Sequence, residues 1–284
     1  DTALYTATGT TVCTGGTIHF TGTDANRTVS VTGNVNALAA ESAPDEVDLG
    51  AITVAASVIT AELNSVQSAF TENLTIDLPN ANGTFTVKSI LNMDDGTLDT
   101  YSHTGKGGAT AYVGASDASV SLLGVDVSSA TAKSNATSNA YIAGTVISEG
   151  DISVLSQGAS IADATTGNGT SVEFVGVGIA HVSAEAAGAF NAYIDTDVRD
   201  SAGTALSSVE MTPDDVNVRA FYYAVARASV VSPDGGVSAG VVTVEVNVAY
   251  SNVTTEAMAA IKGSGAIGND SVSAGDINVS VQGY

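Results

Sequence analysis

The chain has 284 residues, of which 44% are hydrophobic and only 5% are aromatic, and it contains no Trp. A core filled by Val, Ile, Leu and Ala favours closely stacked strands over a bundle of long helices. Its 30 acidic and 8 basic residues give a formal net charge of -22, which excludes readers of nucleic acid and basic membrane-surface proteins. No apolar run is long enough for a transmembrane helix, so we expect no membrane span.

A five-residue phrase recurs along the chain and predicts a repeat protein. It reads Gly-Thr-Ile-His-Phe at residues 16–20, Gly-Thr-Phe-Thr-Val at 83–87, Gly-Asp-Ile-Ser-Val at 150–154, Asp-Asp-Val-Asn-Val at 214–218 and Gly-Asp-Ile-Asn-Val at 275–279. Apolar third and fifth residues around a polar fourth are typical of a strand with one buried face. We therefore expect a lead-in strand at 1–15, repeats at 16–82, 83–149, 150–213 and 214–274, and a partial fifth repeat at 275–284.

A second β element lies between these phrases. Runs that begin at Gly124 and Gly176 end, at the same offset, in an identical Asn-Ala-Tyr-Ile phrase at residues 139–142 and 191–194. Looser versions begin at Gly50 and Gly240, and the last is a strict alternation of Val with Thr243, Glu245 and Asn247. Each repeat is therefore predicted to contain at least two β elements.

The order of these phrases resembles the tandem repeats of large secreted bacterial surface proteins, the filamentous haemagglutinin-like and leukotoxin-type filamentous adhesins. Residues 150–154, 160–170, 175–179 and 192–194 carry the resemblance most clearly, within residues 83–284. It implies an all-β, elongated parallel β-solenoid (β-helix), with about three coils of roughly 22 residues in each repeat. Tandem antiparallel β-sandwich modules are the alternative, because residues 241–250 also suit a long antiparallel strand.

The resemblance implies a non-enzymatic structural protein at the cell surface or outside the cell, a segment or subunit of an extracellular filament or giant adhesin. Its expected partners are copies of itself or flanking repeats, and glycans or proteins on neighbouring or host cells. We expect the fifth phrase to be an assembly strand that joins the N-terminal end of a following copy; its residues are Gly275, Asp276, Ile277, Asn278 and Val279. A carbohydrate-binding or carbohydrate-cleaving solenoid of the tailspike kind and a surface-layer lattice protein are the alternatives.

No catalytic residue is predicted, since the chain has no nucleophile elbow, phosphate loop or dinucleotide fingerprint. His19, His103 and His181 lack the clustering that a zinc site needs. Ca²⁺ is the one candidate cofactor, because carboxylates gather in two short segments that contain Gly. Solvated acidic loops are the competing interpretation of these residues, which are Asp195, Asp197 and Asp200, and Asp94, Asp95 and Asp99.

Asn-x-Ser/Thr triplets are frequent, and in a secreted protein they are acceptors for glycosylation. The competing interpretation is that a polar strand face places abundant Asn, Ser and Thr two residues apart. The candidate acceptors are Asn26, Asn73, Asn82, Asn135, Asn168, Asn252, Asn269 and Asn278.

Overall fold

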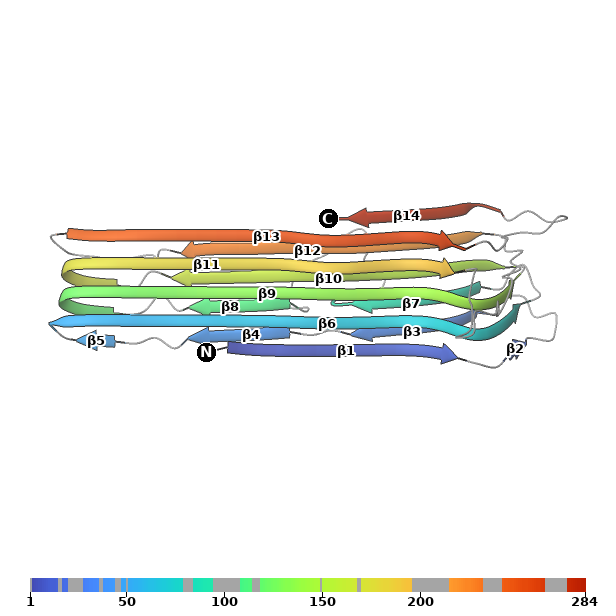
Figure 1. Ribbon diagram of the computed structural model, residues 1–284, viewed down its shortest axis with the longest axis horizontal. Helices are drawn as coiled ribbons and strands as arrows, with labels where there is room; N and C mark the ends of the chain where they lie inside the picture. The colour runs from blue at the N-terminus through green and yellow to red at the C-terminus, as the bar shows by residue number, and fades with distance from the viewer. Residues whose placement is uncertain are drawn as a thin grey trace.

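The fold is a stack of parallel strands in two layers, seen in a computed structural model (Figure 1). Every element among the described residues is a strand. The structure describes residues 2–14, 17–19, 28–35, 38–43, 47–49, 51–78, 84–93, 108–113, 118–148, 150–167, 170–195, 215–231, 242–263 and 275–284.

The strands divide into two sheets that face each other. Sheet A has the order β1-β6-β9-β11-β13, with β2 beside β6 and β5 beside β9. Its strands are β1 (Thr2–Thr14), β2 (Thr17–His19), β5 (Val47–Leu49), β6 (Ile52–Leu78), β9 (Ala118–Ser148), β11 (Thr170–Asp195) and β13 (Val242–Lys262). Sheet B has the order β14-β12-β10-β7-β3, with β8 beside β10 and β4. Its strands are β3 (Thr28–Val35), β4 (Leu38–Ala43), β7 (Thr84–Leu91), β8 (Gly108–Val113), β10 (Asp151–Gly167), β12 (Val216–Val231) and β14 (Ile277–Gly283).

The chain alternates between the sheets, so that each passage through both makes one coil of a β-solenoid. All strand pairs among the described residues are parallel, which confirms the predicted parallel solenoid and shows that the antiparallel sandwich alternative is wrong. The alternating segment at 241–250 belongs to β13, which pairs in parallel with β11. Parallel strands need a crossover, and here the other sheet supplies it.

One repeat forms one coil, so the expectation of three short coils in each repeat is wrong. Asp151 pairs with Thr84, 67 residues earlier, and Val216 pairs with Ile152, 64 residues earlier. The reason is strand length: β9 has 31 residues and β10 has 17, so two strands and their connections use up a whole repeat. The long axis of the molecule consequently runs along the strands rather than along the stack (Figure 1).

The recurring phrases lie side by side, as a parallel register requires. In sheet B, Phe85, Ile152, Val216 and Ile277 form one row across four neighbouring strands. In sheet A the two Asn-Ala-Tyr-Ile phrases pair residue for residue, from Asn139 with Asn191 onward. The spacing read from the sequence is therefore the register of the stack.

The first phrase is the exception to this register. The strand that pairs with β7 in sheet B is β3, with Thr28 beside Thr84 and Val29 beside Phe85. Residues 17–19 instead form β2, which pairs with β6 in sheet A, with Ile18 beside Ile76. The counterpart of Phe85 in the first coil is therefore Val29 and not Ile18, because residues 28–31 repeat the same alternation.

A break in sheet B separates β7 from β8, although both strands pair with β10. Asn92 follows β7 with a φ of 57°, a left-handed conformation that Asn tolerates better than most residues. Its buried amide donates to Ser65 Oγ at 3.4 Å and to the Ala159 carbonyl at 3.3 Å. Gly108 begins β8 with a φ of 147°, and a Cβ there would lie 2.9 Å from the Ile161 carbonyl oxygen. Asn92 thus directly follows β7, and Gly108 is the first residue of β8.

The core between the sheets is made mostly of small side chains. One buried cluster joins Ile59 and Leu63 of β6 to Ala130, Ala162 and Val182. A second cluster contains Phe85, Ile142, Ile152, Ile194 and Val218. Alanine dominates the first cluster, which lets two long strand layers approach closely and fits the low aromatic content.

Buried serines connect the two sheets through hydrogen bonds. Ser156 Oγ of β10 donates to the Ser138 carbonyl of β9 at 2.8 Å, and Ser138 Oγ lies 2.8 Å from Ser89 Oγ of β7. Farther along the same strands, Ser160 Oγ donates to the Ser134 carbonyl at 3.0 Å. These hydroxyls have partners, so their burial avoids the cost of an unpaired polar group.

Candidate functional site on the outer face of sheet A

The outer face of sheet A is the side turned away from sheet B, and the parallel register arranges its side chains in straight rows. Residues of β6, β9, β11 and β13 that share a row come from four successive coils. Successive rows lie about 7 Å apart along the strands, because every second residue faces the same side. The face is therefore a regular array, and its chemistry changes from row to row.

An aromatic row lies near the end of these strands. The rings of Phe70 and Tyr141 stack with centroids 4.6 Å apart, and those of Tyr141 and Tyr193 with centroids 4.8 Å apart. Lys262 of β13 lies in the next row, beside Asp195, and its Nζ reaches to 4.1 Å from the Tyr193 ring centroid. Because the ring faces cover one another, the row stabilises the stack and offers no open ring face between coils for a sugar to stack on.

An amide row runs beside the aromatic one. Asn191 Nδ2 donates to Asn139 Oδ1 at 3.0 Å, and Asn139 Nδ2 donates to Ser68 Oγ at 3.4 Å. The Asn-Ala-Tyr-Ile phrase thus supplies an outward Asn, an inward Ala, an outward Tyr and an inward Ile. Its repetition in sequence is explained by contacts between equal residues of neighbouring coils.

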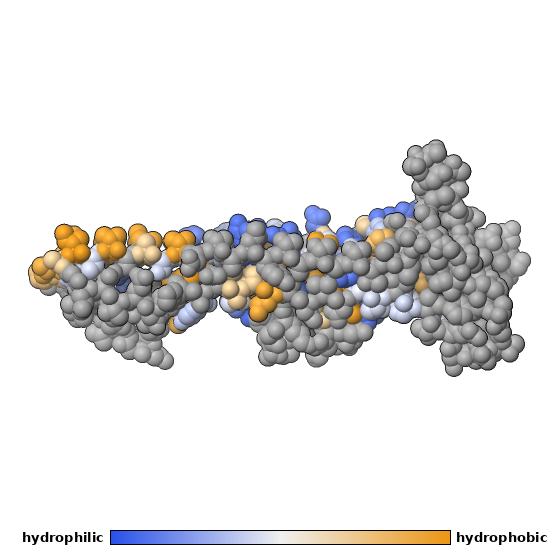
Figure 2. Space-filling model, turned by 90° about the horizontal axis from the view of Figure 1, so that it is seen from below, coloured by the Kyte–Doolittle hydropathy of each residue, from blue (hydrophilic) through white to orange (hydrophobic). Residues whose placement is uncertain are grey.

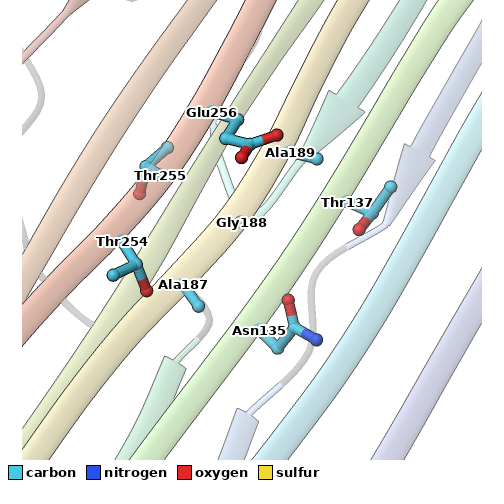
Figure 3. Close-up of a pocket in the computed structure, with 8 residues that line it drawn as sticks. All are labelled: Asn135, Thr137, Ala187, Gly188, Ala189, Thr254, Thr255 and Glu256. Carbon is cyan, nitrogen blue, oxygen red and sulfur yellow. The ribbon is translucent and has the colours of Figure 1, made fainter.

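A shallow trough of about 480 Å³ crosses the middle of the outer face (Figure 3). Its floor is formed by three small residues of β11, Ala187, Gly188 and Ala189, between the longer side chains of β9 and β13. The trough forms because the register places Ala187 beside Asn135 and Thr254, and Ala189 beside Thr137 and Glu256. Its lining residues are Asn135, Thr137, Ala187, Gly188, Ala189, Thr254, Thr255 and Glu256.

A row of alternating charge borders the trough. Glu62, Lys133 and Glu185 occupy one row of β6, β9 and β11, and they line a second hollow of about 180 Å³ that shares Asn135 and Ala187 with the first. Asn64 Nδ2 donates to Glu62 Oε1 at 3.2 Å. Lys133 lies between the carboxylates of Glu62 and Glu185. It occupies the space that two carboxylates acting together in hydrolysis would need for substrate and water.

The chemistry of the trough suits hydrogen bonding to a neutral polar ligand. Its described lining offers one amide and several hydroxyls as donors and acceptors, with Glu256 as the single ionisable group. Hydrolysis of a glycosidic bond usually needs two carboxylates on either side of that bond. The trough can therefore hold a sugar or an amide-rich chain, but it lacks the usual pair of acids.

The outer face of sheet A is aliphatic near the N-terminal ends of β6, β9, β11 and β13. Ile52, Leu123, Val175 and Val242 share one row, and the next two rows are also aliphatic. We call these three rows the aliphatic patch: Ile52, Leu123, Val175 and Val242; Val54, Val125, Val177 and Val244; Ala56, Val127, Ile179 and Val246. Ile52 and Val54 are each 71% exposed. Figure 2 shows apolar side chains gathered at this end of the molecule.

In sheet B, the Asp that recurs in the five-residue phrase links neighbouring coils. The backbone amide of Asp215 donates to Asp151 Oδ1 at 3.1 Å, and the amide of Asp276 donates to Asp215 Oδ1 at 2.9 Å. Each carboxylate therefore receives the amide of the equivalent residue in the next coil. The recurrence was visible in the sequence, and these hydrogen bonds between coils explain it.

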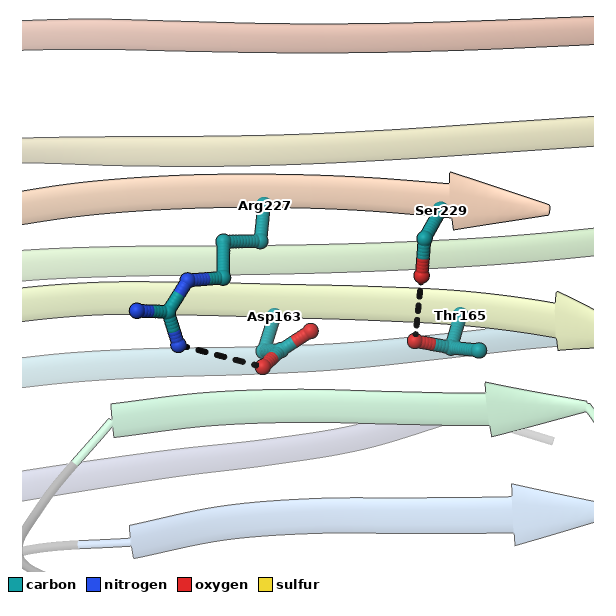
Figure 4. Close-up of polar contacts among 4 residues, drawn as sticks. All are labelled: Asp163, Thr165, Arg227 and Ser229. Atoms are coloured by element: carbon teal, nitrogen blue, oxygen red, sulfur yellow. Dashed lines mark hydrogen bonds and ion pairs between the residues drawn. The ribbon is translucent and has the colours of Figure 1, made fainter. Parts of the chain in front are cut away.

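Polar pairs between neighbouring coils also occur on the outer face of sheet B (Figure 4). Arg227 of β12 lies 4.0 Å from Asp163 of β10, and Ser229 Oγ lies 3.0 Å from Thr165 Oγ1. Both pairs lie between coils in register. Their partial exposure makes them minor contributors to stability.

The calcium candidates lie mainly outside the described residues. Asp94, Asp95, Asp99, Asp197 and Asp200 belong to undescribed segments, and Asp195 is the last residue of β11. Among the described residues no group of three or more His, Cys, Asp or Glu could hold a metal ion. Calcium binding therefore stays a prediction.

The glycosylation candidates divide in the same way. Asn26, Asn82, Asn168 and Asn269 lie outside the described residues, and Asn73 lies in β6 without a described side chain. Asn135 and Asn278 are exposed, and Asn252 is half-buried. Asn135 and Thr137 of one triplet both line the trough, so a glycan on Asn135 would occupy it. The assembly candidates 275–279 lead into and form the start of β14 at the edge of sheet B.

Several features of this face were not predicted from the sequence. The trough, the charged row and the outward orientation of the aliphatic patch all depend on which strands become neighbours. The described part of the chain contains no helix of the length and apolar character that a membrane crossing requires. Comparisons with protein-family models, with curated proteins and with solved structures found no match for this chain.

Proposed function

We propose that the chain is a non-enzymatic structural building block that grows by adding coils to the edge of its stack, as part of an extracellular filament or surface adhesin. The supporting observation is the exposure of core rows at the last described coil. Ile277, Val279 and Val281 of β14 are 51%, 43% and 48% exposed. Their partners in β12, Val216, Val218 and Ala220, are at most 1% exposed.

The N-terminal coil has the register to cover these residues in a second copy. In sheet B, β3 pairs with β7, β7 with β10, β10 with β12 and β12 with β14. Through these pairs, residues 29–35 occupy the same rows as residues 277–283. In sheet A, Thr2 shares its row with Tyr250, and Thr14 shares its row with Lys262. A second copy can therefore place its β1 beside β13 and its β3 beside β14, and Asp276 then offers its carboxylate to the amide of the partner's Thr28.

The edges themselves support such a joint. Edge strands of natural sheets are usually protected by charged residues or proline. Among the described strands at this joint, β1, β3 and β14 contain neither, whereas β13 carries Glu245, Glu256 and Lys262. Three of the four strands at the joint therefore lack this protection, which makes them candidates for strand addition.

The shape of the assembly of stacked copies follows from the large number of residues in each coil. Each repeat of more than 60 residues adds one strand spacing, about 4.8 Å, to the length of the stack. Copies joined in this way give a broad ribbon rather than a thin rod. The extracellular setting rests on the resemblance to secreted surface proteins, and it accords with the acidic composition.

The test compares two lysine variants of β14. Val279→Lys places a charge on the face that continues the core, whereas Asn278→Lys places it on the exposed outer face of the same strand. We expect the unaltered protein and Asn278→Lys to form ribbons in electron micrographs and concentration-dependent oligomers in sedimentation. Val279→Lys should remain monomeric with unchanged circular dichroism. Assembly of Val279→Lys equal to that of Asn278→Lys, or a strictly monomeric unaltered protein, would contradict the proposal.

The trough favours carbohydrate binding as a second candidate function. Amide and hydroxyl groups at Asn135, Thr137 and Thr254 match the hydroxyl groups of a neutral glycan. Glycan-array binding that Asn135→Ala and Glu256→Gln both weaken, with unchanged melting temperature, would support it. Binding that neither change affects would place the glycan elsewhere.

A further inference from the structure

The aliphatic patch reverses the usual arrangement of a half-buried strand. In β13, Val242, Val244, Val246 and Val248 lie on the outer face and are 46–52% exposed, although their alternation is typical of a buried side. The polar residues between them, Glu245 and Asn247, continue the inner face instead. The alternation is typical of a strand whose Val side is buried. In β13 that side faces away from sheet B, so sheet B does not cover it.

The described residues form no hydrophobic cluster beneath this part of sheet A, although Thr53 on the inner face is buried. The buried clusters of the described residues begin at Ile59 in β6, Ala130 in β9 and Val182 in β11. The three patch rows lie before these residues, separated from them by the row of Val58, Ser129, His181 and Val248. Its twelve positions cover roughly 400 Å², taking four strands about 4.8 Å apart and three rows about 7 Å apart. A contiguous apolar area of this size on a monomer is commonly functional.

We propose that the aliphatic patch is where two stacks of this chain pair face to face, sheet A against sheet A, an inference that rests on the proposed end-to-end growth. The area argues for this occupant. A stable interface buries about 800 Å² on each partner, so one copy supplies roughly half of what is needed. Two or more stacked copies supply enough, because every added copy contributes the four patch strands β6, β9, β11 and β13, although its β1 begins at Thr2, two rows beyond the patch, and contributes none.

Charge fixes the geometry of the pair. A face-to-face pair with its two-fold axis along the strands would bring the row of Glu62, Lys133 and Glu185 over its copy in a chain of net charge -22. An axis parallel to the stack, placed at the patch, brings only the patches together and directs the polar remainder of each sheet to opposite sides. Both stacks then grow in the same direction, and each added copy adds its own patch to the contact.

This geometry makes pairing depend on growth. Monomers repel one another and bury too little apolar area to pair, whereas short ribbons pair along their whole length. Because the opposing force is electrostatic, pairing should strengthen with added salt as charges are screened. Growth at the edge and pairing at the patch are therefore separate contacts with separate residues.

The experiment measures ribbon length and thickness in one sample by cryo-electron microscopy. Val177→Lys and Val246→Lys alter the patch, and Thr131→Lys is the control on the same face of the same sheet. Each change reduces the net negative charge, so a loss of pairing cannot come from a larger net charge on the chain. We expect ribbons of two-stack thickness in the unaltered protein and the control, and single-stack ribbons of unchanged length in the patch variants.

The outcomes separate the two proposals. Long single-stack ribbons in the unaltered protein, or paired ribbons in the patch variants, overturn the inference and leave end-to-end growth standing. The absence of any ribbon in the unaltered protein contradicts the proposed function and the growth-dependent pairing together. Binding of the unaltered protein, but not of Val177→Lys, to phosphatidylcholine vesicles in place of pairing would identify a lipid surface as the occupant and overturn the second copy.

Discussion

Phe190 of β11 crosses the core and lies against Gly158 of β10, in space that any Cβ at that glycine would overlap. Gly188 has the same relation to this ring, since a Cβ there would lie 3.0 Å from Phe190 Cε2 and 2.6 Å from the Ala136 carbonyl oxygen. The ring also stacks with Tyr222, with 5.7 Å between the centroids. A large side chain in this thin core therefore depends on glycine in both sheets.

Gly158→Ala should destabilise the stack by overpacking. The added methyl group meets a fully buried ring, and we expect the free energy of unfolding to fall by about 1–3 kcal/mol. Urea denaturation followed by circular dichroism measures the change. Gly178→Ala is the matched control, because its Cβ would lie 3.7 Å from Glu245 Cγ, and it should stabilise by about 0.5–1 kcal/mol. Equal effects of the two changes would show that the Phe190 contact does not limit packing.

Asp215→Ala should weaken the link between the last coils. It removes the oxygen that accepts the amide of Asp276 at 2.9 Å, and a loss of about 1 kcal/mol is expected. Asp215→Asn keeps an oxygen at this place and removes one negative charge from a column that includes Asp151. Thermal denaturation should show the Asn variant at least as stable as the original. A similar loss in both variants would exclude the side-chain oxygen as the cause.

Tyr141→Ala should disrupt the aromatic row at its centre. Two stacked pairs are lost, and each contributes about 0.5–1.5 kcal/mol, so the expected loss is about 1–3 kcal/mol. Near-ultraviolet circular dichroism and urea denaturation report the change. Tyr141→Phe keeps the ring and should differ little from the original protein, so a comparable loss there would point to the hydroxyl group instead.

Ser156→Ala should lower stability through lost hydrogen bonds between the sheets. The buried hydroxyl donates to the Ser138 carbonyl at 2.8 Å and lies 3.0 Å from Ser138 Oγ, so we expect a loss of about 1 kcal/mol. Ser153→Ala, at a half-buried outward position of the same strand, should change stability by less than about 0.5 kcal/mol. Denaturant titration of both variants gives the comparison, and an equal response would remove the serine link as a stabilising feature.

The sequence predicted the stack because parallel pairing makes recurrence visible. Equivalent residues of successive coils become neighbours, so Tyr141 and Tyr193 had to recur at a fixed offset to stack. The number of coils in each repeat left no such trace. Strands as long as β9 contain an alternation of period two throughout, and nothing in that alternation states where one coil ends.

The site was less predictable than the fold. Alternation shows that Val242 and Val244 share a face with each other but not with Glu245, yet it does not state which face meets the other sheet. The trough depends on Ala187 lying between Asn135 and Thr254, residues far apart in the sequence. Such neighbours become apparent only once the register of all four strands is known.

The length of the strands has a mechanical consequence. Neighbouring coils are joined by two long parallel ladders, one in each sheet, such as β11 with β13 and β10 with β12. Tension applied along the stack loads the hydrogen bonds of both ladders at the same time, so separating two coils requires many bonds to fail together. A ribbon built in this way resists stretching along its axis while remaining only two strand layers thick.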